Sequence, residues 1–456
     1  MDISVIGLGK LGLCSAACFA SRGHNVIGVD SNRRHVLELQ RGKCPLDEPD
    51  LEELLGRCGH RFTAAGSIEE AVLNSDVTLV IVPTPSGPDG RFDNACVEDV
   101  LTSIGPVIAR KETFHVVDVV STVMPGSCLQ SFIPLLESLS GMDCGRDFGL
   151  VYNPEFIALG SVIRDFLNPD MVLIGASDER SAGIVRGLYE ATCLSKPYIA
   201  CMSLVNAEIT KLSLNCYVTM KISFANELAS ICERVDGADI DVITDAIGSD
   251  SRIGGKYLKG GLGFGGPCFP RDNIAFQVFA HAAGVEARLS PRVVAVNHAV
   301  VDRLFALLVN HVTDGGRIAL LGLSYKPGTH IVEESQSIML ARRLGAAGYQ
   351  VAVHDPKALH AAREALGDQV VYADDVYAAA AGADAIALMT SWPEYRRLDW
   401  SRIESNVHSE AVLLDSWRVL RGISFSKIRY IGLGLGDTQN GLLTDETCAA
   451  TGTHNA

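Results

Sequence analysis

The segment YLKGGLGFGGPCFPRDN, residues 257–273, places one cysteine in a glycine-rich loop. Arg271 and Asp272 follow Cys268 at three and four residues. A cysteine in such a loop is a buried packing residue, a metal ligand or a nucleophile. No C-x-x-C pair occurs among the thirteen cysteines, so we expect no metal. CFPRDNIAF predicts a helix directly after Cys268, and the positive end of that helix would favour the thiolate.

A second chemical pattern opens the chain. Residues 3–30 read as a strand, a glycine turn, a helix of small residues and a second strand that ends in Asp30. Gly7, Gly9 and Gly12 form G-x-G-x-x-G, in which the glycines allow a tight turn, close approach of a pyrophosphate and close packing of helix on strand. Asp30 lies where a carboxylate would bind the ribose hydroxyls. The pattern predicts a dinucleotide site and favours NAD over NADP.

Further apolar runs end in polar residues. VTLVIVPTP, FHVVDVVST and FGLVYNPEF each predict a strand with a polar carboxyl end, which lines the ligand crevice in a doubly wound sheet. Any one of these polar residues taken alone is more simply a turn or cap residue. The candidates are Thr84, Ser121, Thr122, Asn153 and Glu155.

A long helix and a second α/β pattern follow. Residues 203–235 contain no proline or glycine and predict one helix so apolar that it must be widely covered, partly by another subunit. Lys211 and Asn215 share one of its faces. Strands alternate again with helical segments from residue 315, without a full dinucleotide fingerprint. No internal repeat is evident.

The expected fold class is therefore α/β, with two Rossmann-like doubly wound parallel-sheet domains joined by a long central helix and a helical region. We predict an NAD-binding domain over 1–200, a central helical dimerisation domain with the cysteine loop over 201–300, a C-terminal Rossmann-like domain over 301–440 and a disordered tail over 441–456. The family resemblance described below implies that the domain over 301–440 binds the nucleotide sugar.

Composition limits the class of partner. The net charge of −15 over 456 residues argues against a nucleic-acid surface. No apolar run is long enough to span a membrane, which takes about 20 residues. The odd number of cysteines, without a signal peptide, is typical of reduced thiols in a cytoplasmic protein.

These motifs, in this order and nearly to residue 435, resemble the nucleotide-sugar dehydrogenase family, also called the UDP-glucose/GDP-mannose dehydrogenase family. The resemblance implies an NAD-dependent oxidation of a sugar C6 alcohol to a carboxylate in two hydride transfers, through a cysteine thiohemiacetal and a thioester. The segment NPEFIALGSVIRDFLNPDMVLIG resembles the UDP-glucose branch most. A homodimer or higher homo-oligomer is expected.

The resemblance also implies roles for single residues. Cys268 matches the nucleophile, Lys211 and Asn215 the pair that holds the oxyanion or water at C6, and Asp272 the aspartate that handles the catalytic water. Thr122 matches a threonine near the nicotinamide, and Glu155 an acid/base in thioester hydrolysis. The implied cofactor contacts are Gly7, Gly9, Lys10, Leu11, Gly12, Asp30, His35, Thr84, Thr122 and Arg271. The implied substrate contacts are Glu155, Phe156, Lys211, Asn215, Arg252, Tyr257, Lys259, Phe264, Gly265, Tyr325, Lys326 and Arg418.

The sequence departs from the family pattern at several positions. Leu159 stands where UDP-glucose members usually have a second glutamate, and Ile331 and Glu333 replace an aspartate and an arginine. His35 stands where a basic residue often contacts the adenosine, and Pro267 replaces a common serine. These changes leave two alternatives open: another nucleotide sugar (UDP-N-acetylhexosamine, GDP-mannose or a dTDP-hexose), and a sugar-nucleotide-binding protein without turnover. A hydroxyacid dehydrogenase of related fold, which oxidises once, would not need Cys268.

Overall fold

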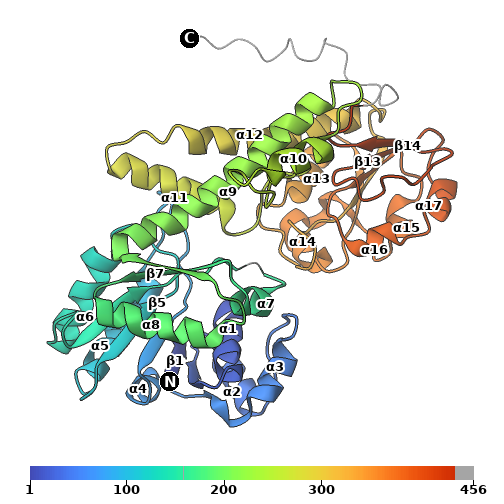
Figure 1. Cartoon of the computed structure of the whole chain (residues 1–456). Coiled ribbons are helices and arrows are strands. Elements are labelled where there is room, and N and C mark those ends of the chain that lie inside the picture. Colours follow the sequence, from blue (N-terminus) through green and yellow to red (C-terminus); the bar gives the residue numbers. More distant parts are fainter. Residues whose placement is uncertain (158, 437–456) are drawn as a thin grey trace. The chain divides into compact units, whose positions relative to one another are not determined.

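The structure is a computed structural model, and it describes residues 1–157 and 159–436 (Figure 1). The chain divides into two compact units, Met1–Leu214 with Val278–Gly284 and Asn215–Gln277 with Val285–Ala456. The predicted tail over 441–456 lies outside the described residues. In the described part no helix is long and apolar enough to cross a membrane, and no group of three or more His, Cys, Asp or Glu could hold a metal ion.

The first unit is built on an eight-stranded sheet in the order β3-β2-β1-β4-β5-β6-β7-β8. Neighbouring strands are parallel except β6 and β7, which are antiparallel, so β7 and β8 run against the rest. The sheet is therefore not wholly parallel, contrary to the prediction. The apolar patterns predicted the strands but could not predict their directions, because an apolar strand reads the same in either direction. The strands are β1 (Asp2–Ile6), β2 (Asn25–Val29), β3 (Phe62–Ala64), β4 (Val77–Val80), β5 (His115–Val119), β6 (Phe148–Tyr152), β7 (Met171–Ala176) and β8 (Tyr198–Ser203).

Helices cover both faces of this sheet, as the doubly wound pattern requires. Buried side chains of α1, α3, α7 and α8 pack on one face, and those of α4, α5 and α6 pack on the other. The α/β fold class is thereby confirmed for this unit. The helices are α1 (Lys10–Ser21), α2 (Arg33–Gln40), α3 (Leu51–Cys58), α4 (Ile68–Leu73), α5 (Ala95–Ile108), α6 (Ile133–Ser140), α7 (Val162–Leu167) and α8 (Glu179–Thr192).

Four helices follow the first sheet along the chain. The predicted long helix is confirmed as α9 (Leu204–Cys232), and the helix expected after Cys268 is confirmed as α11 (Phe269–Ala282). The boundary between the two units falls within each of these helices. The other two, α10 (Ile240–Ser249) and α12 (Leu289–Val309), belong to the second unit.

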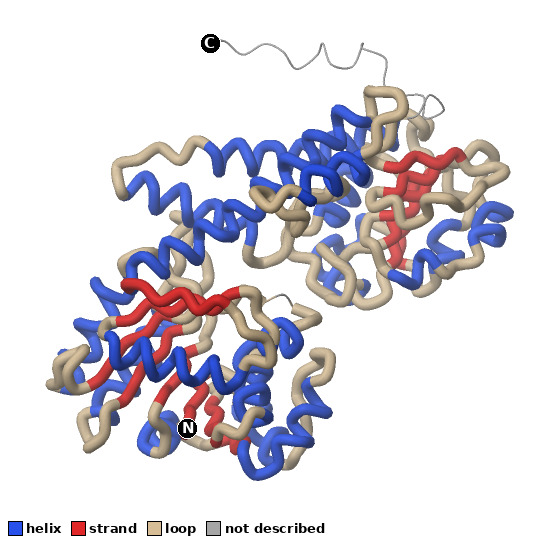
Figure 2. The backbone as a smooth tube through the Cα atoms, in the orientation of Figure 1, coloured by secondary structure: helices blue, strands red, loops and turns tan. Residues whose placement is uncertain are grey.

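The second unit contains a six-stranded parallel sheet in the order β11-β10-β9-β12-β13-β14 (Figure 2). This order repeats that of the first six strands of the other sheet, although the sequence shows no repeat. The strands are β9 (Arg317–Leu321), β10 (Gln350–His354), β11 (Val371–Tyr372), β12 (Ala385–Leu388), β13 (Val412–Asp415) and β14 (Arg429–Gly432).

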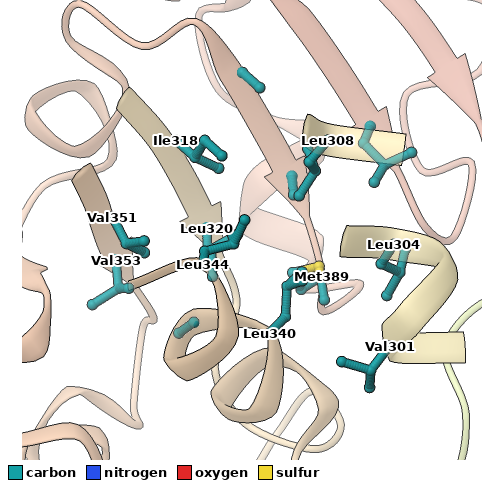
Figure 3. Close-up of a cluster of buried hydrophobic side chains, with 14 of the residues drawn as sticks. Val301, Leu304, Leu308, Ile318, Leu320, Leu340, Leu344, Val351, Val353 and Met389 are labelled. Atoms are coloured by element: carbon teal, nitrogen blue, oxygen red, sulfur yellow. The ribbon is translucent and has the colours of Figure 1, made fainter. Parts of the chain in front are cut away.

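Figure 3 shows the core on one face of the second sheet. Leu304 and Leu308 of α12 and Leu340 of α13 point toward Ile318 and Leu320 of β9. The opposite face is covered by α15, α16 and α17. The helices are α13 (Gln336–Ala346), α14 (Leu359–Leu366), α15 (Val376–Ala380), α16 (Pro393–Arg396) and α17 (Trp400–Asn406).

Candidate active site

The glycine motif forms the turn between β1 and α1. Gly7 has φ +99°, and a Cβ there would lie 2.1 Å from the carbonyl oxygen of Ile81. A Cβ on Gly12 would lie 1.9 Å from the carbonyl oxygen of Gly7, so the close helix–strand contact needs glycine. A Cβ on Gly9 would meet nothing within 4 Å, and no side chain caps α1 there. The open amides at this helix start suit a pyrophosphate.

Asp30 follows β2 and remains partly exposed. Its carboxylate accepts hydrogen bonds from the amides of Leu8 and Asn32, each at 2.6 Å. Each oxygen therefore keeps acceptor capacity for ribose hydroxyls. His35 lies in the first turn of α2, and Lys10 and Leu11 open α1. These residues fit NAD at this end of the sheet.

The loops after β4 and β5 are tied together. Thr84 donates its hydroxyl to the carbonyl of Thr122 at 2.7 Å, and Ser121 accepts from the amide of Val82 at 2.9 Å. Asn153 instead donates to the carbonyl of Leu173 at 2.7 Å, which holds β6 against β7. The structure thus brings Thr84, Ser121 and Thr122 together and gives Asn153 a contact within the sheet.

Glu208, which the sequence analysis did not single out, holds the turn that follows Thr122. Its carboxylate is fully buried on α9 and accepts from the amides of Gly126 and Cys128 at 2.6 and 2.9 Å. Glu208 stands three residues before Lys211, so one stretch of α9 carries both side chains. The acid therefore positions the loop of Thr122.

Glu155 follows β6 and is bonded from two sides. The hydroxyl of Tyr189 donates to its Oε1 at 2.7 Å, and Nζ of Lys211 donates to its main-chain carbonyl at 2.5 Å. Lys211 is buried and also lies 4.4 Å from the ring centroid of Phe156. Burial raises the pKa of Glu155 to about 7, against the opposing effects of the Tyr189 hydrogen bond and the Lys211 charge. A carboxyl with this pKa exchanges a proton readily near neutral pH.

In the second unit, three carboxamides hold the glycine-rich loop before Cys268. Asn226 accepts from the amide of Gly261 at 2.9 Å and donates to the carbonyl of Leu262 at 3.1 Å. Asn297 binds both the amide and the carbonyl of Phe264, at 2.7 and 2.9 Å. Gln336 accepts from the amide of Gly263 at 2.6 Å. The loop is therefore a fixed support for the cysteine.

Cys268 is exposed and directly precedes α11. Its carbonyl accepts the amide of Asp272 at 2.9 Å, which closes the first helical turn. The Asp272 carboxylate is buried and accepts from Nδ2 of Asn215 at 2.6 Å. The Nε of Arg271 lies 3.5 Å from the Asp272 Oδ1. The second unit thus brings Asn215 and Asp272 into direct contact within one helical turn of the thiol.

Aromatic rings surround this loop. Tyr257 and Phe264 each meet the ring of Phe269 edge-on, at 6.2 and 6.4 Å between centroids. Tyr257 is half-exposed and has φ +63°. The ring of Tyr325 lies against Gly266, where a Cβ would be 2.7 Å away, and burial raises the pKa of Tyr325 to about 12. Phe264 is buried, so Tyr257 and the half-buried Tyr325 are the rings of this group that keep surface open to solvent.

Four of the remaining predicted substrate residues are Lys259, Lys326, Arg252 and Gly265. Lys259 is exposed, Lys326 is half-buried, and Arg252 is exposed and pairs with Asp250 at 2.6 Å. Gly265 is required by space, since a Cβ there would lie 2.3 Å from the carbonyl oxygen of Glu334. These positions are compatible with substrate contacts, and their roles stay predictions.

Arg418 differs from the others. Its side chain is only 3% exposed, and it binds both carboxylate oxygens of Asp241 at 2.7 and 2.9 Å. It also donates to the carbonyls of Gly260 and Leu433 at 2.8 and 2.6 Å. Most of its N–H groups are thus used inside the protein. The geometry gives Arg418 an anchoring role at the start of the cysteine loop.

The residues that depart from the family pattern are packed or hydrogen-bonded in the local structure. Leu159 packs against the core of the first unit. The carbonyl of Glu333 accepts the amide of Gly266 at 3.0 Å, and that of Ile331 accepts the amide of Tyr325 at 3.1 Å. The main chain of Glu333 thus supports the cysteine loop whatever its side chain.

Several site residues carried no signal that sequence reasoning used. Tyr189, Glu208, Asn226, Asn297 and Gln336 stand in helices among apolar residues. A polar side chain in an apolar helical pattern is the signal that could have found them, because a buried polar group needs a partner. Their partners could not be named from spacing alone.

A glycine-lined helix start on one α/β sheet, and an exposed cysteine on a rigid loop beside the other, define a dinucleotide-dependent oxidoreductase. The chain belongs to the UDP-glucose/GDP-mannose dehydrogenase family. It matches the NAD binding domain of that family over residues 1–193, its central domain over 205–299 and its UDP binding domain over 319–422. It is an NAD-dependent nucleotide-sugar dehydrogenase.

Three relatives show the range of the family. The chain is 38% identical to a UDP-glucose 6-dehydrogenase of Haloferax volcanii, over 92% of this chain and 97% of that one. It is 36% identical to a GDP-mannose 6-dehydrogenase of Pseudomonas putida, over 79% and 82%. The solved structure of a UDP-glucose dehydrogenase from Pyrobaculum islandicum matches with a TM-score of 0.84 at 36% identity, over 95% and 98%.

Proposed function

We propose that the chain oxidises the C6 alcohol of UDP-glucose to the carboxylate of UDP-glucuronate and reduces two NAD⁺ per sugar. The observation that carries the proposal is the exposed Cys268 at the start of α11, one turn before Asp272. The likeness to UDP-glucose 6-dehydrogenases supports the choice of sugar. GDP-mannose is the second candidate, because a GDP-mannose 6-dehydrogenase is nearly as similar.

The chemistry proceeds in four steps, and NAD bound at the glycine turn supplies the hydride acceptor for both oxidations. The C6 alcohol loses a hydride and a proton and becomes an aldehyde. The Sγ of Cys268 adds to the aldehyde carbon and the oxygen takes a proton, which gives a thiohemiacetal. Loss of a second hydride and the hydroxyl proton gives a thioester. Water then adds, the C–S bond breaks, and the carboxylate and the Cys268 thiolate form with release of two protons.

The other catalytic residues act on charge and protons. Lys211 and Asn215 provide an ammonium and an amide, which would stabilise the oxyanion that develops at C6. Asp272 accepts a hydrogen bond from Asn215 and so orients this amide. Asp272 also binds and orients the catalytic water. Glu155 takes the proton from the water that attacks the thioester, and Thr122 positions that water beside the nicotinamide.

The nucleotide end of the substrate is assigned to the aromatic loop. Tyr257 offers its ring to the base, and the buried Phe264 supports it through their shared neighbour Phe269. Lys326 and Lys259 offer positive charge to the diphosphate. Tyr325 packs against the loop at Gly266 and supports it there. Arg252, Gly265 and Phe156 are the further proposed contacts.

The decisive experiment measures the NADH formed when the sugar is limiting. UDP-glucose, UDP-N-acetylglucosamine, GDP-mannose and dTDP-glucose are each offered to wild type and to Cys268→Ala. We expect two NADH per UDP-glucose from wild type and none in the variant. Cys96→Ala, which removes another exposed cysteine, is the matched control and should retain the wild-type yield.

Other yields would change the proposal. One NADH per sugar would argue against a completed double oxidation and for a hydroxyacid-type reaction. Two NADH from GDP-mannose alone would move the substrate to that sugar. Binding of UDP-glucose without NADH from any sugar would make the chain a binding protein, in which Leu159 and Glu333 outweigh the preserved catalytic set.

The chain is further proposed to form a homodimer through α9. Tyr217, Phe224 and Ile231 follow each other at seven-residue intervals, which places them along one helix face. They are 54%, 48% and 54% exposed. A second copy of the same helix would cover this apolar stripe. Light scattering should show a dimer for wild type and a monomer for Phe224→Asp, whereas a monomeric wild type would refute the dimer.

The location in the cell remains a prediction from the sequence. The described cysteines are all free thiols, and Cys14, Cys18 and Cys58 lie in the core of the first unit. Reduced thiols suit the cytoplasm.

A further inference from the structure

Tyr189 lies on α8, thirty-four residues from Glu155, and belongs to no motif of the sequence. Its side chain is buried, and its hydroxyl donates to Oε1 of Glu155 at 2.7 Å. The ring meets Phe19 edge-on and lies tilted against Phe166, each at 5.9 Å between centroids. Three aromatic rings from α1, α7 and α8 therefore hold the hydroxyl in place.

Toward the ionised carboxylate of Glu155 the hydroxyl of Tyr189 can only donate. Burial and the nearby Glu155 charge raise the pKa of Tyr189 well above its ordinary value, so the phenol keeps its proton. Oε1 of the Glu155 carboxylate is then occupied by a donor, whereas Oε2 has no bond from Tyr189. A proton is therefore favoured at Oε2 over Oε1, because protonation of Oε1 would weaken the acceptor of this hydrogen bond.

Other ionisable groups act on Glu155 from neighbouring elements. The Lys211 ammonium lowers the pKa of Glu155, as the Tyr189 hydrogen bond does. Asp118 on β5 is fully buried, and burial followed by the Glu155 charge raises its pKa well above the ordinary value. Burial thus favours the neutral form of Asp118 beside the Glu155 carboxylate.

Two thiols also interact electrostatically with Glu155. After burial, the Glu155 charge contributes to the raised pKa of Cys18 on α1 and of Cys193 after α8. Burial raises the pKa of Cys18, and it raises the pKa of Cys193 to about 11. Both thiols are neutral near pH 7. They contribute no charge that could replace the hydrogen bond from Tyr189.

We propose that Tyr189 is a positioning residue for Glu155, which holds Oε1, leaves Oε2 as the proton-exchanging oxygen and sets the pH range in which the carboxylate forms. The role in turnover rests on the proposed function, in which Glu155 takes a proton from water during thioester hydrolysis. In that step the C–O bond to water forms, the C–S bond to Cys268 breaks and one water proton moves to Glu155. Tyr189 itself touches neither substrate nor cofactor in this scheme.

The test compares wild type with Tyr189→Phe, which keeps the ring and removes only the hydroxyl. The first readout is the ¹³Cδ resonance of Glu155, assigned by its absence in Glu155→Gln and followed against pH without substrate. The second is the pH profile of NADH formation at saturating UDP-glucose and NAD⁺. Loss of a hydrogen bond to a carboxylate should move both midpoints upward by about one pH unit. At pH 6.5 turnover should then fall about tenfold, with KM for UDP-glucose unchanged.

Tyr395→Phe is the matched control. Tyr395 is fully buried in the second unit, and its hydroxyl donates to the carbonyl of His354 at 3.2 Å. This variant should lose a buried hydrogen bond without moving either midpoint. Should Tyr189→Phe not fold, wild type alone still tests the inference, through the isotope shift of the Glu155 resonance in D₂O that a hydrogen bond to Oε1 requires.

The outcomes separate the inference from the proposed function. An unmoved Glu155 resonance in Tyr189→Phe overturns the inference. A moved resonance with an unmoved pH profile overturns the role of Tyr189 in turnover. A moved resonance in a protein that oxidises no nucleotide sugar supports the contact between Tyr189 and Glu155 and defeats the proposed function alone.

Discussion

The two α/β domains place the same kind of residue at the same point of the fold and use it differently. In both, the first strand is followed by a glycine at φ +99°, Gly7 or Gly322, and the second strand is followed by an aspartate, Asp30 or Asp355. Both aspartates accept an amide from the turn after the glycine. The strand order around them is also the same.

The difference lies in how many donors surround each carboxylate. Asp30 is partly exposed and accepts from two amides, so it has room for ribose hydroxyls. Asp355 is buried and surrounded by donors, which leaves it no role toward a ligand. These donors are the amides of Leu323, Ser324, Lys357 and Ala358, the Ser324 hydroxyl and the Trp392 indole. The same fold position therefore keeps acceptor capacity for a ligand in the first domain and is filled by internal hydrogen bonds in the second.

The largest expected effect is on Asp355. Asp355→Ala leaves several buried donors without an acceptor and should cost about 3 kcal/mol or more in the free energy of unfolding. All three tryptophans, Trp392, Trp400 and Trp417, lie in the second unit, so urea unfolding followed by tryptophan fluorescence reports on this domain. A loss below about 1 kcal/mol would refute the structural role.

Asp30→Ala should lower the affinity for NAD more than it lowers the free energy of unfolding. The affinity for NAD should fall at least tenfold, about 1.4 kcal/mol, because the ribose loses its acceptor. The free energy of unfolding should change by about 1 kcal/mol or less, since the two amides can reach water. Calorimetric titration with NAD measures the affinity. Urea unfolding followed by far-UV circular dichroism measures the stability, because all three tryptophans lie in the second unit. Equal effects of Asp30→Ala and Asp355→Ala on stability would abolish the contrast between the domains.

Asp118 offers a smaller test within the first domain. It is as buried as Asp355, but no hydrogen-bond donor reaches either of its oxygens among the described residues. Burial raises its pKa, so the folded state prefers the protonated form, and stability is lost as the pH rises above the ordinary pKa of about 3.9.

Asp118→Asn removes this titration. The variant should equal wild type near pH 4 and be more stable by about 1 kcal/mol at pH 7. Thermal unfolding at both pH values, with far-UV circular dichroism, checks the sign. A variant that is less stable at pH 7 would mean that Asp118 is ionised and paired in the folded state.

Local signals carried much of the prediction. The close packing at Gly12 follows from its contact with Gly7, which is near in the sequence, and the helix after Cys268 follows from its own residues. The direction of β7 and the repeated strand order could not be predicted, because an apolar strand reads the same in either direction and two domains can share a fold without sharing a sequence pattern.

By itself the sequence determined the α/β class, the glycine turn with Asp30, the helix that carries Lys211 and Asn215, and a cysteine at a helix start. Each of these depends on backbone geometry or periodicity within a short stretch of chain. Only the tertiary structure decided that Tyr189 binds Glu155, that Asn297 holds the cysteine loop and that Arg418 is taken up by Asp241. These contacts join residues 34, 33 and 177 positions apart. They arise because a buried polar group must find a partner, and which partner is near depends on how the whole chain packs.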